Sequence, residues 1–142
     1  MNMVWVTGAG GLIGHALVQT ASDCVPEWQV WGLTRDQLDL TDGSAVRAAF
    51  RSRRPLIIVH CAAMSRGPMC QAQPKLAWQV NTEVTRQLAD LAGDIPLVFL
   101  SSDLVFDGRR CHYREEDPVH PLSVYAATKA AAEKLVLAHP QH

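Results

Sequence analysis

Residues 3–14 read MVWVTGAGGLIG, a short apolar run followed by glycines at positions 8, 11 and 14. The run Met3–Thr7 predicts a buried β-strand and the residues after it predict a helix, so the glycines lie in a strand-to-helix turn. Without a Cβ atom, Gly8 and Gly11 let the backbone approach a ligand, and Gly14 lets the helix pack closely on the strand. Because the first amides of a helix attract anions, this stretch predicts a site for the pyrophosphate of a dinucleotide.

Apolar runs alternate with segments of helical period along the chain, as in successive strand-helix units. Strands are expected at Met3–Thr7, Gln29–Leu33, Leu38–Leu40, Leu56–His60 and Leu97–Ser101. Helices are expected at Leu12–Ala21, after the cap candidates Thr41 and Asp42, at Pro74–Gly93 and at Leu122–Ala138. In the first helix, the pairs Leu12/Ala16 and Ile13/Leu17 are expected to face the sheet. We therefore predict one Rossmann-type α/β domain over residues 1–142, with a doubly wound parallel sheet in the order 3-2-1-4-5.

The composition indicates a small-molecule partner. Thirteen Lys and Arg residues against 14 Asp and Glu residues give a net charge of −1, which argues against nucleic acid and anionic membranes as partners. No apolar stretch reaches the length of a membrane span and no leader pattern precedes the first strand, so we expect a cytoplasmic protein. The four cysteines are expected to be reduced, and the histidines show no ligand spacing, so no metal site is predicted.

The end of the second predicted strand bears on the choice of cofactor. It reads Gly32-Leu33-Thr34-Arg35-Asp36, where a fold that prefers NAD usually places an acidic residue on the adenosine ribose. Arg35 could instead contact a 2′-phosphate, which favours NADP(H). NAD(H) stays open because Asp36 could bind the ribose, and Arg35 could be a solvated loop charge.

Three polar residues form a candidate catalytic set. Tyr125 and Lys129 are four residues apart on the last predicted helix and so project from one face. An ammonium group stabilises a neighbouring phenolate, which suits a tyrosine to proton transfer near neutral pH. Ser102 follows a strand at the edge of the sheet where ligands bind, so its hydroxyl could polarise a carbonyl. Alone, the Tyr–Lys pair would more often be an exposed helix pair.

With these motifs the chain resembles the extended short-chain dehydrogenase/reductase family, whose hallmarks are TGxxGxxG and a Ser/Thr-Tyr-Lys set. The matching segments are Thr7–Gly14, His60–Ala63, Asn81, Ser101–Gly108 and Tyr125–Lys129. Within that family, SSDLVFDG and YREEDPVHPLSVYAATK are most similar to the dTDP-4-dehydrorhamnose reductases and the related regulatory subunit of methionine adenosyltransferase. The resemblance therefore implies an NADP(H)-dependent reductase of a nucleotide-linked 4-keto-6-deoxy sugar.

The resemblance also implies roles for individual residues. Ser102 would hold the substrate carbonyl, Tyr125 would protonate its oxygen, and Lys129 would tune Tyr125 and bind the cofactor ribose. Asn81 would support the site by ordering the backbone around the last helix. The expected cofactor contacts are Gly8, Gly10, Gly11, Leu12, Ile13, Gly14, Thr34, Arg35, Asp39, Leu40, Cys61, Ala62, Ala63, Tyr125 and Lys129.

Members of the family are much longer, and their later part forms the lobe that binds the nucleotide sugar. We therefore expect a domain truncated before that lobe, with an apolar strand edge that must pair with something. Two alternatives to a reductase follow: a cofactor-binding regulatory module without turnover, and a catalytically incomplete fragment. By resemblance, the helices Pro74–Gly93 and Leu122–Ala138 would form the contact of a homodimer.

Overall fold

The computed structural model describes residues 2–142 and contains a four-stranded parallel sheet in the order β2-β1-β3-β4. The strands are β1 (Asn2–Thr7), β2 (Trp28–Leu33), β3 (Ile57–His60) and β4 (Leu97–Phe99). Because all the strands run in one direction, the chain segments that follow them gather at a single edge of the sheet. The predicted α/β architecture of Rossmann type is confirmed.

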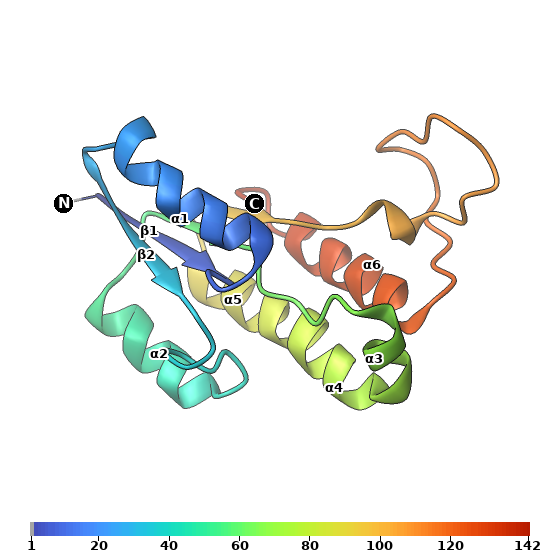
Figure 1. Cartoon of the computed structure of the whole chain (residues 1–142), viewed down its shortest axis with the longest axis horizontal. Coiled ribbons are helices and arrows are strands. Elements are labelled where there is room, and N and C mark those ends of the chain that lie inside the picture. The colour runs from blue at the N-terminus through green and yellow to red at the C-terminus, as the bar shows by residue number, and fades with distance from the viewer. Residues whose placement is uncertain (1) are drawn as a thin grey trace.

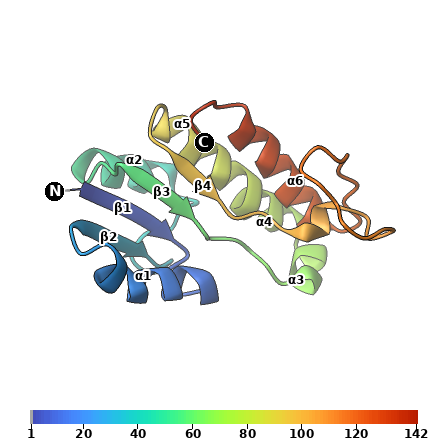
Figure 2. The ribbon, with the colours of Figure 1, turned by 90° about the horizontal axis from the view of Figure 1, so that it is seen from above.

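Helices cover both faces of the sheet (Figures 1 and 2). Helix α1 (Leu12–Cys24) lies on one face, and α2 (Gly43–Ser52), α5 (Val84–Ala92) and α6 (Val124–Leu137) lie on the other. The short helices α3 (Gly67–Ala72) and α4 (Pro74–Trp78) extend beyond the carboxyl ends of the strands. A π-helix, η1 (Gln79–Glu83), joins α4 to α5, and a 3₁₀ turn, η2 (Asp103–Val105), follows β4.

The main core lies between the sheet and the helices α2 and α5, which cover one of its faces. Trp5 of β1 is fully buried and makes edge-to-face contacts with Trp31 and Phe50, at centroid distances of 5.3 and 5.7 Å. Asp42 caps α2 by accepting the amides of Ser44 and Ala45. The apolar side chains Val46 and Phe50 of α2 and Val84 and Leu88 of α5 point into this core.

The predicted strand Leu38–Leu40 is wrong. The amides of Gln37 and Leu38 both donate to the carbonyl of Thr34, which closes a turn directly after β2. Leu38 is 8% exposed, so its apolar side chain fills the core from a turn rather than from a strand. The observed strand order is the predicted one without this element.

The predicted orientation of the first helix is also wrong. Leu12, Ile13 and Leu17 are 91%, 53% and 38% exposed, whereas Gly14 is buried. Gly14 lies so close to the glycine turn that a Cβ at that position would collide with the carbonyl of Gly8, so only glycine permits this approach. This close approach, rather than the apolar pairs, sets the rotation of the helix.

The helical segment after β3 is more divided than the sequence predicts. The range Pro74–Gly93 comprises α4, η1 and α5, and α3 was not predicted at all. Pro68 stands in the first turn of α3, a position that suits proline, and this signal could have identified the helix. The last helix starts at Val124 because the hydroxyl of Ser123 accepts the amide of Ala126 as an N-cap.

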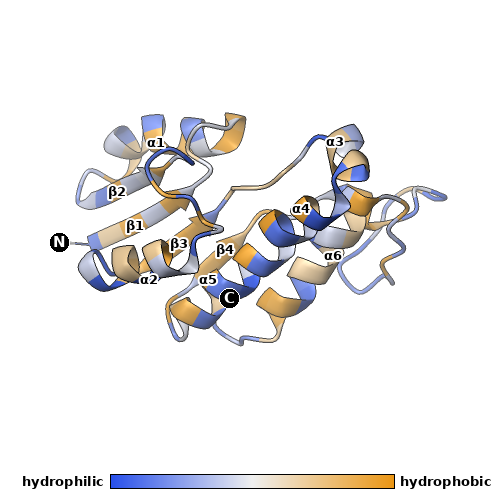
Figure 3. Ribbon diagram, turned by 90° about the horizontal axis from the view of Figure 1, so that it is seen from below, coloured by the Kyte–Doolittle hydropathy of each residue, from blue (hydrophilic) through white to orange (hydrophobic). Residues whose placement is uncertain are grey.

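One half of the sheet is open on the face that carries α1. Strand β4 pairs only with β3 among the described residues, and Val98 is 49% exposed. Figure 3 shows that β3 and β4 are largely apolar, whereas α2 and α5 carry both polar and apolar residues. The predicted apolar edge is therefore present.

Across residues 2–142 no helix combines the length and apolar character that crossing a membrane requires, and the location of the protein in the cell stays a prediction.

Candidate functional site

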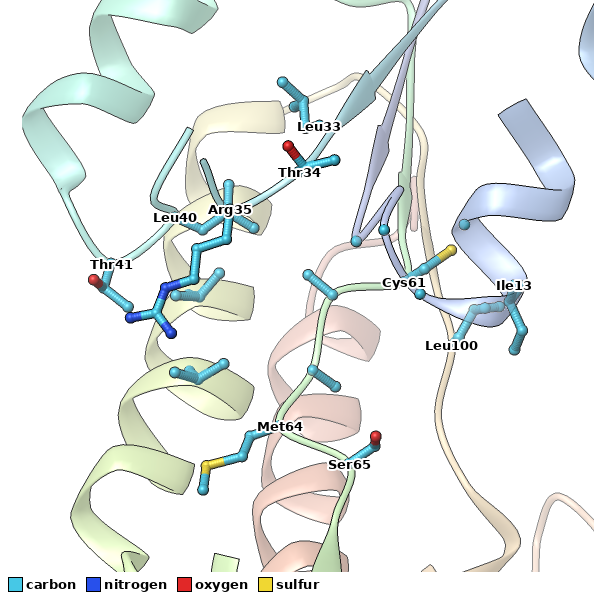
Figure 4. A pocket seen from close by; sticks show the side chains of 18 of the residues that line it. Ile13, Leu33, Thr34, Arg35, Leu40, Thr41, Cys61, Met64, Ser65 and Leu100 are labelled. Atoms are coloured by element: carbon cyan, nitrogen blue, oxygen red, sulfur yellow. The ribbon is translucent and has the colours of Figure 1, made fainter. Parts of the chain in front are cut away.

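A cavity of about 630 Å³ opens at the carboxyl ends of the strands. Thr34, Arg35, Leu40 and Thr41 lie on one side of it, and Ile13, Cys61 and Leu100 lie on the other, as Figure 4 shows. All the residues expected to contact a cofactor line this cavity, namely Gly8, Gly10, Gly11, Leu12, Ile13, Gly14, Thr34, Arg35, Asp39, Leu40, Cys61, Ala62, Ala63, Tyr125 and Lys129.

The glycine turn forms one wall by very close backbone contacts. Gly8 has a φ of 69°, and a Cβ there would lie 2.7 Å from the amide nitrogen of Ala62. The amide of Gly11 donates to the carbonyl of Gly8 at 2.9 Å, which closes the turn before α1 begins. The turn and the segment after β3 therefore leave a smooth wall at the start of a helix, which fits a pyrophosphate group.

The segment after β2 forms the side of the cavity where the sequence predicts the adenosine end of a cofactor. The Arg35 side chain is 80% exposed, and its Nε lies 3.9 Å from an oxygen of Asp39. Hydrogen bonds from the hydroxyl and amide of Thr41, assisted by the charge of Arg35, lower the pKa of Asp39. Asp36 is exposed and is not part of the cavity wall. The Arg35 guanidinium can turn toward an anionic ligand, because its contact with Asp39 is exposed rather than buried.

Tyr125 and Lys129 both reach the cavity from α6. Lys129 is 3% exposed, its Nζ donates to the carbonyl of Leu100 at 2.6 Å, and it lies 3.9 Å above the centre of the Phe99 ring. Burial lowers the pKa of Lys129 to about 8, although the charge of Glu133 opposes the shift. The structure thus holds this ammonium group beside the cavity wall, one turn from Tyr125.

The lowered pKa of Lys129 predicts a specific dependence of stability on pH. Between pH 8 and 10.5 the unfolded chain keeps the Lys129 proton and the folded protein loses it, so the free energy of unfolding rises with pH. Denaturant unfolding at pH 7.5 and pH 9.5 is expected to show a larger gain for the wild type than for Lys129→Met. Equal changes in the two proteins would contradict the shift.

The two serines after β4 both line a neighbouring groove, but only Ser101 also lines the cavity. Ser101 lines the cavity together with Tyr125 and Lys129. Ser102 lines only the groove, and its hydroxyl accepts the amide of Leu104 at 3.2 Å as the N-cap of η2. The structure therefore does not bring Ser102 into the cavity wall beside Tyr125 and Lys129, and its predicted role requires its side chain to turn away from η2.

Asn81 acts on the backbone rather than on the cavity. It is 1% exposed, its Oδ1 accepts the amide of Met64 at 2.7 Å, and its Nδ2 donates to the carbonyl of Met64 and the hydroxyl of Thr128. The Thr128 hydroxyl in turn donates to the carbonyl of Tyr125. The side-chain oxygen and nitrogen of Asn81 thus both join the cavity wall, and the nitrogen also joins it to α6, so Asn81 is a positioning residue in this arrangement.

The sequence did not identify several residues of the cavity wall. These are Leu33, Leu38, Thr41, Met64, Ser65, Met69, Leu76, Val80, Val84, Leu100 and Ser101. Most of them are apolar side chains with no distinctive motif, and several belong to the stretch from Met64 to Val84 that begins beside the unpredicted helix α3.

Residues 2–142 contain no group of three or more His, Cys, Asp or Glu side chains arranged for a metal ion.

The chain is similar to known proteins over almost its whole length. A family model described as "RmlD substrate binding domain" matches residues 1–142. The chain is 36% identical over 141 residues to methionine adenosyltransferase 2 subunit beta of Xenopus laevis, covering 93% of this chain and 42% of the relative. It is 40% identical over 135 residues to dTDP-4-dehydrorhamnose reductase of Streptomyces griseus, covering 93% of this chain and 44% of the relative.

A solved structure gives the same picture at the level of the fold. The dTDP-4-dehydrorhamnose reductase of Bacillus anthracis, determined in complex with NADP, matches with a TM-score of 0.90 and 31% identity. The match covers 98% of this chain and 50% of that one. The chain spans less than half the length of the two curated relatives above, because the matches cover 42% and 44% of those relatives.

Proposed function

Because this chain belongs to the RmlD substrate binding domain family, we propose that it binds NADP(H) and serves the reduction of a keto group on a nucleotide-linked 4-keto-6-deoxy sugar. One observation carries the proposal. A single cavity is lined by the glycine turn, the basic end of β2 and the Tyr125–Lys129 pair. Such a cavity offers a phosphate site, a cation for the adenosine end and a proton donor around one shared space.

The residues present fit a dinucleotide. The smooth backbone wall at Gly8 and Ala62 would hold the pyrophosphate at the start of α1, and Arg35 would pair with a 2′-phosphate. Lys129 would turn from the carbonyl of Leu100 toward the ribose hydroxyls. The bound nicotinamide would supply hydride to the substrate carbonyl.

Tyr125 would give its proton to the carbonyl oxygen of the sugar as the hydride arrives. The positive charge of Lys129 would stabilise the phenolate that this transfer leaves. A serine hydroxyl, from Ser102 as the sequence predicts or from Ser101, would hold the same oxygen. The two curated relatives are more than twice as long as the matched part, so we propose that a further lobe binds the nucleotide sugar and covers the open edge of β4.

The direct test combines the protein, NADPH and dTDP-4-keto-6-deoxy sugars, with NADPH consumption followed by absorbance. Where the source gene encodes a longer product, that product is used. We expect oxidation of NADPH that depends on the dTDP-linked keto sugar, because the proposed hydride acceptor is the keto group of that sugar. Tight NADPH binding without reduction of any keto sugar would contradict the reductase proposal.

Arg35→Ala is expected to weaken NADPH binding by about tenfold, because one charge-assisted contact to the 2′-phosphate is lost. NADH binding should change little, since NADH has no 2′-phosphate. Fluorescence titration of both cofactors against the wild type and the variant measures the difference. Arg109→Ala removes an equally exposed arginine outside the cavity and is the matched control. Equal affinities of the wild type for NADPH and NADH would overturn the role of Arg35.

A second candidate function is a cofactor-binding regulatory module. It is favoured by the 36% identity to methionine adenosyltransferase 2 subunit beta. In that case the cavity would bind NADP(H) and the protein would associate with a methionine adenosyltransferase without turnover. Stable capture of that enzyme, together with no NADPH consumption, would favour this candidate. The homodimer expected from the two helical segments stays a prediction, which light scattering checks.

A further inference from the structure

A buried histidine lies behind the cavity wall. His60 ends β3, is 1% exposed and does not line the cavity. Its Nδ1 lies 2.7 Å from the hydroxyl oxygen of Thr7, and its Nε2 lies 3.0 Å from the hydroxyl oxygen of Thr85. The ring therefore joins the last residue of β1 to the first turn of α5.

The protons along this chain of hydrogen bonds can be assigned by counting donors and acceptors. The Thr85 hydroxyl donates its one hydrogen bond to the carbonyl of Asn81 at 2.7 Å. It therefore accepts a hydrogen bond from His60 Nε2–H. Burial, assisted by the charge of Lys129, lowers the pKa of His60 to about 3, so the ring carries one proton only. Nδ1 consequently accepts a hydrogen bond from the Thr7 hydroxyl.

The other tautomer would break this order. With the proton on Nδ1, the Thr7 hydroxyl would lose the acceptor that it has in His60, and Nε2 would compete with Asn81 for the proton of Thr85. A buried donor without a partner is unfavourable, so the Nε2–H tautomer is the one that satisfies every group. The hydrogen bonds then run in one direction, from Thr7 to Asn81.

Both ends of this directed chain hold the cavity wall. The Thr7 hydroxyl accepts the amide of Ala62 at 3.2 Å, and Ala62 is the residue that packs against Gly8. At the other end, Asn81 binds the amide and the carbonyl of Met64. The segment from Cys61 to Met64, which lines the cavity in Figure 4, is thus fixed at two points by residues that His60 connects.

We propose that His60 is a positioning residue, which holds the segment Cys61–Met64 against the glycine turn through a one-directional chain of hydrogen bonds and so sets the cavity for a dinucleotide. This inference rests on the proposed cofactor binding, because positioning has a measurable effect only if a dinucleotide enters the cavity. His60 itself touches neither the cofactor nor the substrate.

The chain offers a matched set of variants. Thr85→Val keeps the shape of the side chain and removes the hydroxyl that receives the His60 proton, whereas Thr85→Ser keeps the hydroxyl. Thr82→Val is the control, because Thr82 is also buried and its hydroxyl donates to the carbonyl of Thr128 outside this chain. None of these side chains lines the cavity.

Two measurements test the proposal. The ¹⁵N spectrum of the wild-type protein reports the tautomer of His60 directly, and we expect the Nε2–H form without titration between pH 5 and pH 8, which lies above its lowered pKa of about 3. Fluorescence titration then measures NADPH affinity. We expect Thr85→Val to weaken binding by about tenfold relative to Thr82→Val, the change that loss of one buried hydrogen bond can produce. Thr85→Ser should restore most of the affinity.

The possible failures are distinguishable. The Nδ1–H tautomer, or a ring that titrates near pH 6, would overturn the proposal even if no variant folds. Equal NADPH affinities of Thr85→Val and Thr82→Val would also overturn it. A wild-type protein with the Nε2–H tautomer that binds neither NADPH nor NADH would instead overturn the proposed function, and the positioning role with it.

Discussion

Gly8→Ala is expected to abolish dinucleotide binding and to lower the free energy of unfolding by about 2–5 kcal/mol, from backbone strain and overpacking together. Gly8 has a φ of 69°, where an L side chain is strained, and its Cβ would lie 2.7 Å from the amide nitrogen of Ala62. That neighbour is backbone of the segment after β3, which packs against the glycine turn in the same cavity wall, so it cannot turn aside. Denaturant unfolding and fluorescence titration with NADPH measure the two effects.

Gly10→Ala is the control for this substitution. A Cβ on Gly10 would meet only the methyl carbon of Thr34, at 3.9 Å, which is ordinary contact. Its free energy of unfolding should therefore stay close to that of the wild type. If Gly8→Ala were as stable as Gly10→Ala, the close approach of the turn to Ala62 would not exist in solution.

Tyr125→Phe is expected to lower kcat for keto-sugar reduction by about 10²–10⁴, because it removes the proposed proton donor. The affinity for NADPH should change little, since the phenyl ring stays in the cavity wall and Lys129 remains to bind the ribose. Steady-state kinetics and a separate binding titration distinguish loss of chemistry from loss of binding.

Tyr113→Phe is a control because Tyr113 lies outside the cavity, where its hydroxyl donates to Asp107. This variant should keep a kcat close to that of the wild type. Undiminished turnover in Tyr125→Phe would contradict the proposed proton donor. An inactive wild type that binds NADPH would favour the regulatory module instead.

Local patterns in the sequence predicted the elements that depend on neighbouring residues. The strand, glycine turn and helix at residues 2–24 and the apolar stripe of α5 all follow from spacing over a few residues. The order β2-β1-β3-β4 also agrees with the prediction, because crossovers between parallel strands have a fixed hand. The residues expected to contact a cofactor were identified from motifs such as the glycine turn, whose spacing sets the local backbone geometry.

The errors arose where specific backbone contacts override the apolar pattern of the segment. Leu38–Leu40 has the composition of a strand, but the turn after β2 places Leu38 directly in the core. In α1, the rotation is set by the contact of Gly14 with the carbonyl of Gly8, which no helical periodicity reports. Backbone contacts in the turn after β2 and in the glycine turn therefore decided both of these features.

The sequence by itself determined the parallel α/β fold and the glycine turn, because both follow from local periodicity and from residues without a Cβ atom. Only the tertiary structure decided which polar groups share the site. It placed Ser101 rather than Ser102 in the cavity wall, and it joined His60 to Thr7 and Thr85, which are 53 and 25 residues away in the sequence. Buried hydrogen bonds form wherever folding removes polar groups from water, and their partners need not be neighbours in the chain.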